Sequence, residues 1–397
     1  MDRQSRALRA CVVVALAAWL PACTLFSGKP DAPVVTPRFE QLSAEDVSRL
    51  IPKKVKDREG WARDVVEALT EHDLGTAPAS VCSVLAVIEQ ESGYKENPVV
   101  PSLPKIVQKR LDQHAAKLGP VGKPALDKLL EGRAPGHKRS FAQRLKTVRT
   151  ERDLDRVFRD LLRYYEDEYP KTFAVARLVG SVFSSTNLED LNPITTAGSM
   201  QVSVRYARAL GRERGLDDGA VREALYTRAG GVHYGVARLL SYEAGYDEPV
   251  YRFADYNAGF YASRNAAFQE QLAKLTGRKL VPDGDLLAYD KAGEPLDKET
   301  NTLRALLAFR VAYAPELSER QVRRDALLEK TLDFEGTKTF RALKSAYRKA
   351  MGVAPSYARL PDVALDSPKL SRKLSTAWFA RNVDKRFQSC MQRWRAR

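Results

Sequence analysis

The stretch Val84-Leu85-Ala86-Val87-Ile88-Glu89-Gln90-Glu91-Ser92-Gly93 joins an apolar helical run to two acidic residues and a glycine. Glu91 follows Val84 and Ile88 at helical spacing, so we expect its side chain to face packed or enclosed protein. Gly93 suits the left-handed position that ends a helix, which places Glu91 in the last turn. Partial burial and the negative end of the helix dipole both favour a protonated carboxyl, the form that a general acid requires.

Glu89 is the alternative acid in this stretch. It follows Leu85 by four residues and therefore lies on roughly the opposite side of the same helix. Most glutamates are exposed surface residues, and a short motif is weak evidence for catalysis. Periodicity alone does not choose between the two acids, so the choice depends on the rest of the chain.

Length and composition indicate a globular protein. The chain has 397 residues, enough for one large core or two domains, with 44% hydrophobic and 29% charged residues. It contains 65 Lys+Arg and 50 Asp+Glu, a formal charge of +15, and the basic residues look spread along the sequence. This surplus is compatible with an anionic partner, such as an acidic polymer or a membrane surface, and equally with a solubilising surface.

The N-terminus predicts export. Three arginines precede the apolar run Cys11–Leu20 and the segment Pro21-Ala22-Cys23, as in a signal peptide over residues 1–22. The apolar run is too short to span a membrane. The alternative is an ordinary signal peptide with a coincidental cysteine. However, Leu20-Pro21-Ala22-Cys23 resembles the lipobox of bacterial lipoproteins, in which the cysteine is lipidated and becomes the first mature residue.

The lipobox resemblance implies a membrane anchor at Cys23, and Thr24 after it implies the outer membrane, with the protein facing the periplasm. Cleavage leaves 62 Lys+Arg (65 minus 3) and 49 Asp+Glu (50 minus 1), a net charge of +13. Export argues against a nucleic-acid partner, and the sequence does not indicate an oligomeric state.

Two cysteines remain, Cys82 and Cys390. In an oxidising periplasm they either form a disulfide between the central helix and the far C-terminus or remain two separate buried thiols. The histidines are scattered and there is no CxxC pair, so no metal site and no cofactor are predicted.

Helical spacing dominates, and sustained strand alternation is absent, so the predicted class is mainly α. We expect a tether at 23–42 and a core of 43–100 and 190–278 with a helical insertion at 101–189. A C-terminal helical region at 279–397 follows. This last region should open with a small hairpin of Leu280-Val281 and Leu286–Tyr289 around a Pro-Asp-Gly-Asp turn, and end in a basic tail.

Two later stretches give Glu91-Ser92-Gly93 a context: Ala197-Gly198-Ser199-Met200-Gln201-Val202 and Ala254-Asp255-Tyr256-Asn257-Ala258-Gly259. Together they resemble the catalytic domain of soluble lytic transglycosylases, whose patterns are Glu-Ser-Gly, Gly-Leu-Met-Gln and Ala-Tyr-Asn-Ala-Gly. Each motif is weak alone, but three in this order on an exported helical chain are fairly specific. The layout is also similar to that of a poorly characterised family of bacterial lipoproteins.

The resemblance implies a lysozyme-like helical domain over 43–278, with a helical insertion, that cleaves the MurNAc-GlcNAc β-1,4 bond of peptidoglycan without water. Glu91 matches the sole catalytic acid, which protonates the glycosidic oxygen and then takes the proton of the sugar's own 6-hydroxyl. The product is a 1,6-anhydro end, and no second carboxylate is required, unlike in ordinary glycosidases. The later motifs therefore favour Glu91 over Glu89.

The resemblance also implies roles for the other motif residues. Ser92 would help to fix the acid, Met200 and Gln201 would line the glycan groove, Tyr256 would reach the catalytic carboxyl, and Asn257 would bond backbone or substrate. Carbohydrate sites do combine aromatic faces with planar amides. The alternative for Tyr256 and Asn257 is a helix-end turn.

Three features depart from the family pattern. More than a hundred residues separate Gly93 from Gly198, Ser199 replaces a leucine, and Asp255 replaces an alanine. We expect Asp255 to be either a surface residue or a charge near Glu91. The departures favour a rival function, a peptidoglycan-binding or scaffolding lipoprotein with little or no catalysis. A third possibility is a basic module that binds anionic lipid.

Overall fold

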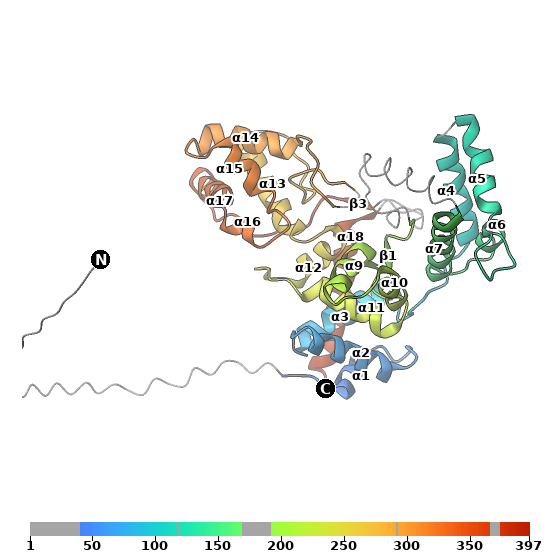
Figure 1. The fold of residues 1–397 in the computed structure, drawn as a ribbon. Helices are drawn as coiled ribbons and strands as arrows, with labels where there is room; N and C mark the ends of the chain where they lie inside the picture. The colour runs from blue at the N-terminus through green and yellow to red at the C-terminus, as the bar shows by residue number, and fades with distance from the viewer. Residues whose placement is uncertain (1–39, 118, 169–191, 291–292, 366–373) are drawn as a thin grey trace, which may run out of the picture. The chain divides into compact units, whose positions relative to one another are not determined.

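The helix α3, Pro78–Glu91, is the centre of the first core (Figure 1). It begins with a proline at a position where a missing N–H costs nothing, and its residues from Val81 to Ile88 are all buried. Gly93 adopts φ +58°, so the helix ends where the sequence predicts. The computed structural model describes residues 40–117, 119–168, 192–290, 293–365 and 374–397. The predicted signal peptide, Cys23, nearly all of the tether and residues 169–189 of the insertion lie outside these ranges.

The described part of the chain is mainly α-helical, as predicted, and residues 40–397 form one unit. Around α3 the first core contains helices from both predicted core segments. Their bounds are α1 Ala44–Leu50, α2 Arg58–Glu71, α9 Val204–Glu213, α10 Asp218–Leu225, α11 Arg228–Leu240 and α12 Pro249–Ala258.

The expected basic tail is instead the helix α18, Thr376–Arg395, which packs against α3 and α12. Phe379, Val383 and Phe387 at helical spacing are buried in the first core, so the last helix joins that core rather than the region before it. Cys82 and Cys390 form a disulfide between α3 and α18, with Cα atoms 5.5 Å apart. Of the two alternatives for these cysteines, the structure therefore contains the bridge.

The first half of the insertion begins and ends at the same place, and its buried side chains, such as Leu103, Phe141 and Val148, belong to the first core. Val99 pairs with Thr150 in an antiparallel bridge, and the Val100 N–H donates to the Arg149 carbonyl at 2.9 Å. Between these residues lie α4 Leu103–Lys117, a 3-10 turn Gly119–Val121, α5 Gly122–Glu131 and α6 Phe141–Leu145. Closed ends allow a long insertion at little cost to the surrounding core.

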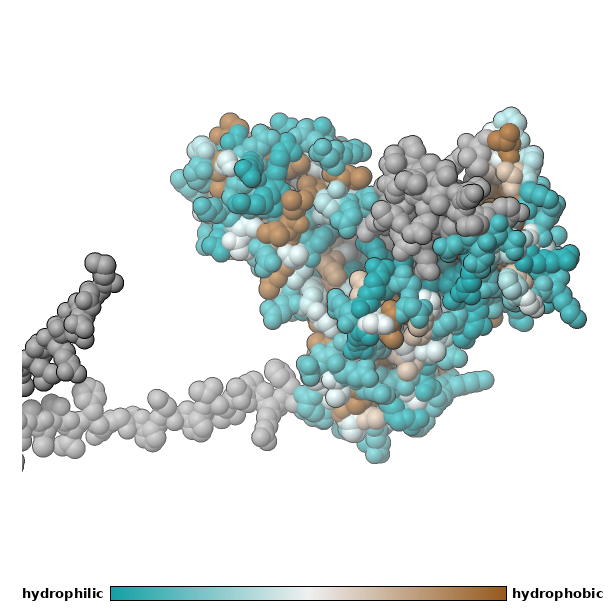
Figure 2. Space-filling model, in the orientation of Figure 1, coloured by the Kyte–Doolittle hydropathy of each residue, from teal (hydrophilic) through white to brown (hydrophobic). Residues whose placement is uncertain are grey.

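Residues 101–149, which we call the basic lobe, carry 12 Lys+Arg and 3 Asp+Glu, a net charge of +9 (12 minus 3). Since 53 of the 65 Lys+Arg lie elsewhere (65 minus 12), the basic residues are spread along the chain as expected, and the net charge of the lobe comes largely from its few acidic residues. Figure 2 shows largely hydrophilic surface over this part of the chain, with a small hydrophobic patch near the end of the α4 and α5 pair. Val121, which lies between those two helices, is 70% exposed.

A second core lies between α13 and the helices that follow it. Their bounds are α13 Ala262–Thr276, α14 Asn301–Tyr313, α15 Glu319–Ala326, α16 Asp333–Gly336 and α17 Lys338–Met351; a short antiparallel pair, β3 Ala364–Leu365 and β4 Leu374–Ser375, precedes α18. The helices from α14 onward lie in the C-terminal region that the sequence predicts to be helical.

The predicted hairpin at 280–289 is wrong. Instead of pairing with each other, its backbone groups bond to buried side chains: Gln269 accepts from the Gly284 N–H at 2.8 Å, and Glu329 accepts from the N–H groups of Leu286 and Leu287 at 2.6 and 2.9 Å. The segment is therefore held by α13 and by the residues that follow α15, because buried N–H groups must find an acceptor.

Glu329 gives this second core a pH-dependent stability. Burial raises the pKa of its carboxyl from 4.5 to about 7, although Lys330 and several hydrogen-bond donors oppose the shift. A raised folded-state pKa means that the contribution is fully present below pH 4.5 and is lost as the pH rises through about 7.

We predict that the free energy of unfolding of the wild type falls by about 2–3 kcal/mol relative to Glu329→Gln between these pH values. Glutamine is neutral at every pH and keeps one acceptor oxygen for the backbone. Urea unfolding of both proteins across this pH range measures the difference. Parallel stability profiles for the two proteins would show that Glu329 does not titrate in the folded state.

Candidate active site

The two glutamates of α3 face different tyrosines. The pKa of Tyr256 is raised well above its ordinary value by burial first and by the charge of Glu91 second. The pKa of Tyr94 is raised by burial first and by the charge of Glu89 second. The two acids thus act on different tyrosines, and Glu91 is the one whose charge acts on the third motif.

The second and third motifs are in direct contact. Tyr256, on α12, donates its hydroxyl proton to the backbone carbonyl of Met200 at 2.8 Å. Met200 between two strands and Tyr256 near the end of α12 are therefore in contact, and Glu91 at the end of α3 is near enough for its charge to raise the pKa of Tyr256, although 165 residues separate Glu91 from Tyr256 in the sequence (256 minus 91).

The second motif is a tight turn between two short antiparallel strands, β1 Thr196–Ala197 and β2 Val202–Ser203. Gly198 adopts φ +80°, and a Cβ atom there would lie 2.2 Å from the Leu225 carbonyl oxygen, so only glycine fits. The next helix, α9, begins at Val204. The turn, rather than a helix, positions the motif.

Met200 does not line a groove as expected. Its side chain is fully buried, and it lies so close to Gly235 of α11 that a Cβ atom there would be 2.1 Å from the Met200 sulfur. The side chain fixes the turn against α11, and the backbone carbonyl is the part that faces Tyr256. A direct contact between the Met200 side chain and a glycan does not fit this position.

The amide of Gln201 is held on both sides. Its Nε2 donates to Glu151 at 3.0 Å and to the Gly198 carbonyl at 3.3 Å, and its Oε1 accepts from the Thr196 hydroxyl at 3.0 Å. The backbone of Gln201 has φ +50°, which is uncommon for a residue with a side chain. These bonds fix the orientation of the amide before any ligand arrives.

Glu151 is a site residue that the sequence did not reveal. It is the first residue of α7, Glu151–Glu168, and only 5% of it is exposed. The available signal was the helix start: Thr150 and Asp153 hydrogen-bond each other, as in a capping box. That pattern predicts a helix beginning here but not an inward-facing carboxylate.

Ser92 and Asn257 have local partners. The Ser92 hydroxyl donates to the Ile88 carbonyl at 3.1 Å and accepts from the Lys95 N–H at 3.3 Å, so it closes the end of α3 beside Glu91. Asn257 is exposed and accepts from the Thr376 hydroxyl at 2.8 Å. Gly259, with φ +122°, ends α12, as the helix-end reading requires.

Asp255 is not a surface residue. It is fully buried and accepts hydrogen bonds from the hydroxyls of Tyr246 and Tyr242 and, at 2.7 Å, from the Ser263 N–H. Burial raises the pKa of its carboxyl, and these donors oppose the shift. The acid in place of the family's alanine therefore joins α12 to the start of α13.

Arg238 of α11 is a second residue that sequence reasoning missed. It is buried, its guanidinium lies 3.7 Å from the centre of the Phe260 ring, and it donates to the Asp255 carbonyl at 3.3 Å. Burial lowers its pKa, whereas nearby tyrosines, Tyr256 among them, raise it. A buried cation thus lies near Tyr256, on the inner side of the site.

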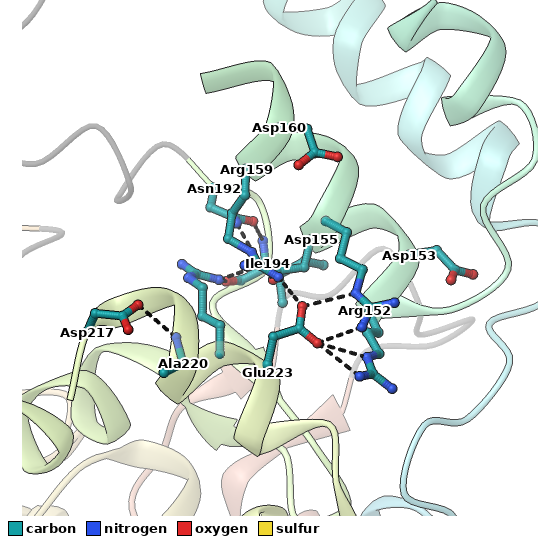
Figure 3. A network of polar contacts seen from close by, with 12 residues as sticks. Arg152, Asp153, Asp155, Arg159, Asp160, Asn192, Ile194, Asp217, Ala220 and Glu223 are labelled. Atoms are coloured by element: carbon teal, nitrogen blue, oxygen red, sulfur yellow. Dashed lines mark hydrogen bonds and ion pairs between the residues drawn. The ribbon is translucent and has the colours of Figure 1, made fainter. Parts of the chain in front are cut away.

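A network of ion pairs fixes α7, and with it Glu151, to α10 (Figure 3). Glu223 of α10 pairs with three arginines of α7, Arg152, Arg156 and Arg159. The bond from Arg156 is the largest cause that lowers the pKa of Glu223, to about 2. A carboxylate with three cations stays ionised throughout the ordinary pH range.

Asp155, one turn after Glu151, completes this network. It is fully buried and accepts from Arg222 at 2.6 Å and from Asn192 at 2.7 Å. Because Asn192 directly follows the segment 169–191, this bond also joins the far end of the insertion to α7. Both ends of the insertion are thereby fixed close to the site, as a retained active site requires.

The described residues include no helix long and apolar enough to cross a membrane. They also contain no group of three or more His, Cys, Asp or Glu side chains arranged to hold a metal ion.

Comparison with known proteins places the chain in a family. Residues 54–393 match the family described as Protein of unknown function (DUF1615). The uncharacterized protein YaiW of Escherichia coli (strain K12) is 37% identical over 352 residues, which cover 88% of this chain and 89% of that protein. No solved structure matches significantly. The chain therefore belongs to the DUF1615 family.

Proposed function

We propose that this protein is a lipid-anchored lytic transglycosylase that cleaves the MurNAc-GlcNAc β-1,4 bond of peptidoglycan. The observation that carries the proposal is the meeting of the three motifs: Tyr256 bonds the turn of the second motif and lies near Glu91 of the first. Motifs that are distant in the sequence and adjacent in space are expected of a shared site. The lysozyme-like character of the helical domain is part of the same proposal.

In this mechanism Glu91 acts first as an acid and then as a base. Its carboxyl gives a proton to the glycosidic oxygen, and the bond between that oxygen and C1 of MurNAc breaks. The 6-hydroxyl oxygen of the same sugar then bonds to C1, and its proton returns to the Glu91 carboxylate. The reaction consumes no water and leaves a 1,6-anhydro end, so one carboxyl is sufficient.

Hydrogen bonds between the surrounding residues fix the geometry of this site. Tyr256 joins the end of α12 to the Met200 carbonyl, and Glu151 orients the Gln201 amide. Pre-organised donors and acceptors bind a transition state better than mobile ones, because little reorganisation remains to be done. The insertion thus contributes a residue to the site through α7.

Lipidation of Cys23 and attachment to the outer membrane, facing the periplasm, are part of the proposal. The disulfide between Cys82 and Cys390 supports a compartment outside the cytoplasm, because such bonds persist in oxidising surroundings. The substrate, peptidoglycan, lies in that compartment.

The basic lobe favours a second candidate function, binding to an anionic lipid surface. Its net charge of +9 lies on a segment that begins and ends at one bridge, and Val121 is exposed between α4 and α5. Basic residues near an anionic membrane contribute about 1 kcal/mol each. Lipid binding is compatible with catalysis, since the lobe and the motifs are different parts of the chain.

We predict that Glu91→Gln abolishes release of anhydro-muropeptides from purified sacculi, with a loss of at least about a hundredfold in rate, as expected when a general acid is removed. Glu89→Gln is the matched control, because it removes the same charge from the same helix on the side of Tyr94, and it should retain activity. Chromatography and mass spectrometry of the soluble products measure both.

Activity that survives in Glu91→Gln but not in Glu89→Gln would show that Glu89, and not Glu91, is the catalytic acid. A wild type that binds sacculi without releasing any product would instead support the rival function, a peptidoglycan-binding lipoprotein without catalysis.

For the lipid candidate, we predict that a Cys23→Ser chain, which lacks the anchor, sediments with anionic vesicles at low salt and not with neutral ones. Replacing Lys105, Lys109 and Arg110 by glutamine should weaken binding by about a hundredfold, at about 1 kcal/mol per residue. The control replaces three exposed cations of α17, Lys338, Arg348 and Lys349. Equal weakening by both triple variants would show that total charge, not the lobe, decides binding.

A further inference from the structure

A concave site of about 500 Å³ lies beside the first motif, within the size range of ligand pockets. We call it the Trp61 pocket. It is lined by Trp61 of α2, Arg228 at the start of α11, Lys56 and the segment 94–99. Trp61 and Tyr94 form its buried wall, with ring centres 5.5 Å apart and planes at 85°.

Asn97 leaves one acceptor in this wall without a donor. Its Oδ1 atom is buried and has no hydrogen-bond partner among the described residues. An unpaired buried amide oxygen is costly, so a ligand that brings an N–H or O–H group would favour a rotation of Asn97 that turns this oxygen towards the pocket.

The charges at the mouth of the pocket favour an anion. Arg228 is already paired with Asp57 and Asp64. Lys56 and Lys95 are exposed and take part in no ion pair within the described ranges, and Glu96 is the one acid among the lining residues. The two lysines are therefore the cations available to a ligand's negative group.

The pocket adjoins the candidate active site on two sides. Lys95 donates its backbone N–H to the hydroxyl of Ser92, the neighbour of Glu91. Val99, at the other end of the lining segment, pairs with Thr150, and the next residue, Glu151, holds Gln201. The residues that line the pocket are therefore linked at one end to the neighbour of Glu91 and at the other end to the neighbour of Glu151.

We infer that the Trp61 pocket binds a peptide carboxylate, which in the proposed function belongs to the stem peptide of the peptidoglycan substrate. The inference rests on that function for the identity of the ligand. A peptide end carries a carboxylate for Lys56 and Lys95 and, close to it, an amide N–H for Asn97. A doubly ionised phosphate monoester offers the charge without such a donor, and a neutral sugar offers donors without the charge. The apolar edge of Pro98 and Val99 suits the small side chains between them.

The test uses the full wild-type chain and measures affinity by calorimetry. The probe is a GlcNAc-MurNAc disaccharide with a tetrapeptide whose carboxylates are either free or all amidated. We expect amidation to weaken binding about tenfold, as expected for the loss of a charge-assisted hydrogen bond. Lys56→Gln/Lys95→Gln should weaken binding of the free-carboxylate probe by the same factor, and amidation of the probe should then have no further effect on affinity. Lys53→Gln/Lys54→Gln, two exposed lysines of the same loop, is the matched control and should change nothing.

Equal affinity for the two probes, or an amidation effect that persists in Lys56→Gln/Lys95→Gln, overturns the inference, and so does an absence of binding by either probe. Competition by inorganic phosphate as strong as by the free peptide would also overturn it, because the pocket would then not distinguish a peptide carboxylate from another anion. These outcomes are separate from the failure of the proposed function, which is a wild type that releases no anhydro-muropeptide. Carboxylate-dependent binding by a protein that releases no anhydro-muropeptide would support the inference about the pocket and contradict the proposed catalysis.

Discussion

The burial of α3 is the constraint on which the rest of the structure depends. Its face from Val81 to Ile88 is covered by helices from the beginning, the middle and the very end of the chain, and a disulfide joins it to the last of them. A helix enclosed in this way cannot shift, so the residues at its exit are fixed. Glu91 and Ser92 lie at that exit, and the charge of Glu91 acts on Tyr256 of α12.

The insertion extends this constraint instead of disturbing it. The Val99–Thr150 bridge closes its first half, and the Asp155–Asn192 bond returns its far end to α7. Three arginines of α7 on Glu223 then hold the helix against α10. A segment that looks like an interruption of the family pattern in sequence supplies Glu151 to the site. Partly buried ion pairs of this kind specify position more than they add stability.

Sequence reasoning succeeded where the signal was local. The end of the central helix at Gly93, the mainly α class and the helical C-terminal region are found as predicted. It failed where the partner was distant: nothing near Leu286 indicates that its N–H bonds Glu329 rather than a neighbouring strand, and nothing near Glu151 indicates that it faces Gln201. The burial of Met200 was missed for the same reason, because it depends on Gly235 of another helix.

The central claim is that the cluster of Glu91, Met200 and Tyr256 cleaves a glycan through the substrate's own hydroxyl. Digestion of sacculi by the wild type in heavy-oxygen water tests it most directly. Intramolecular attack predicts anhydro products that carry no label from the solvent. Heavy oxygen at the new sugar ends would mean that water is the nucleophile, and the protein would then be a hydrolase.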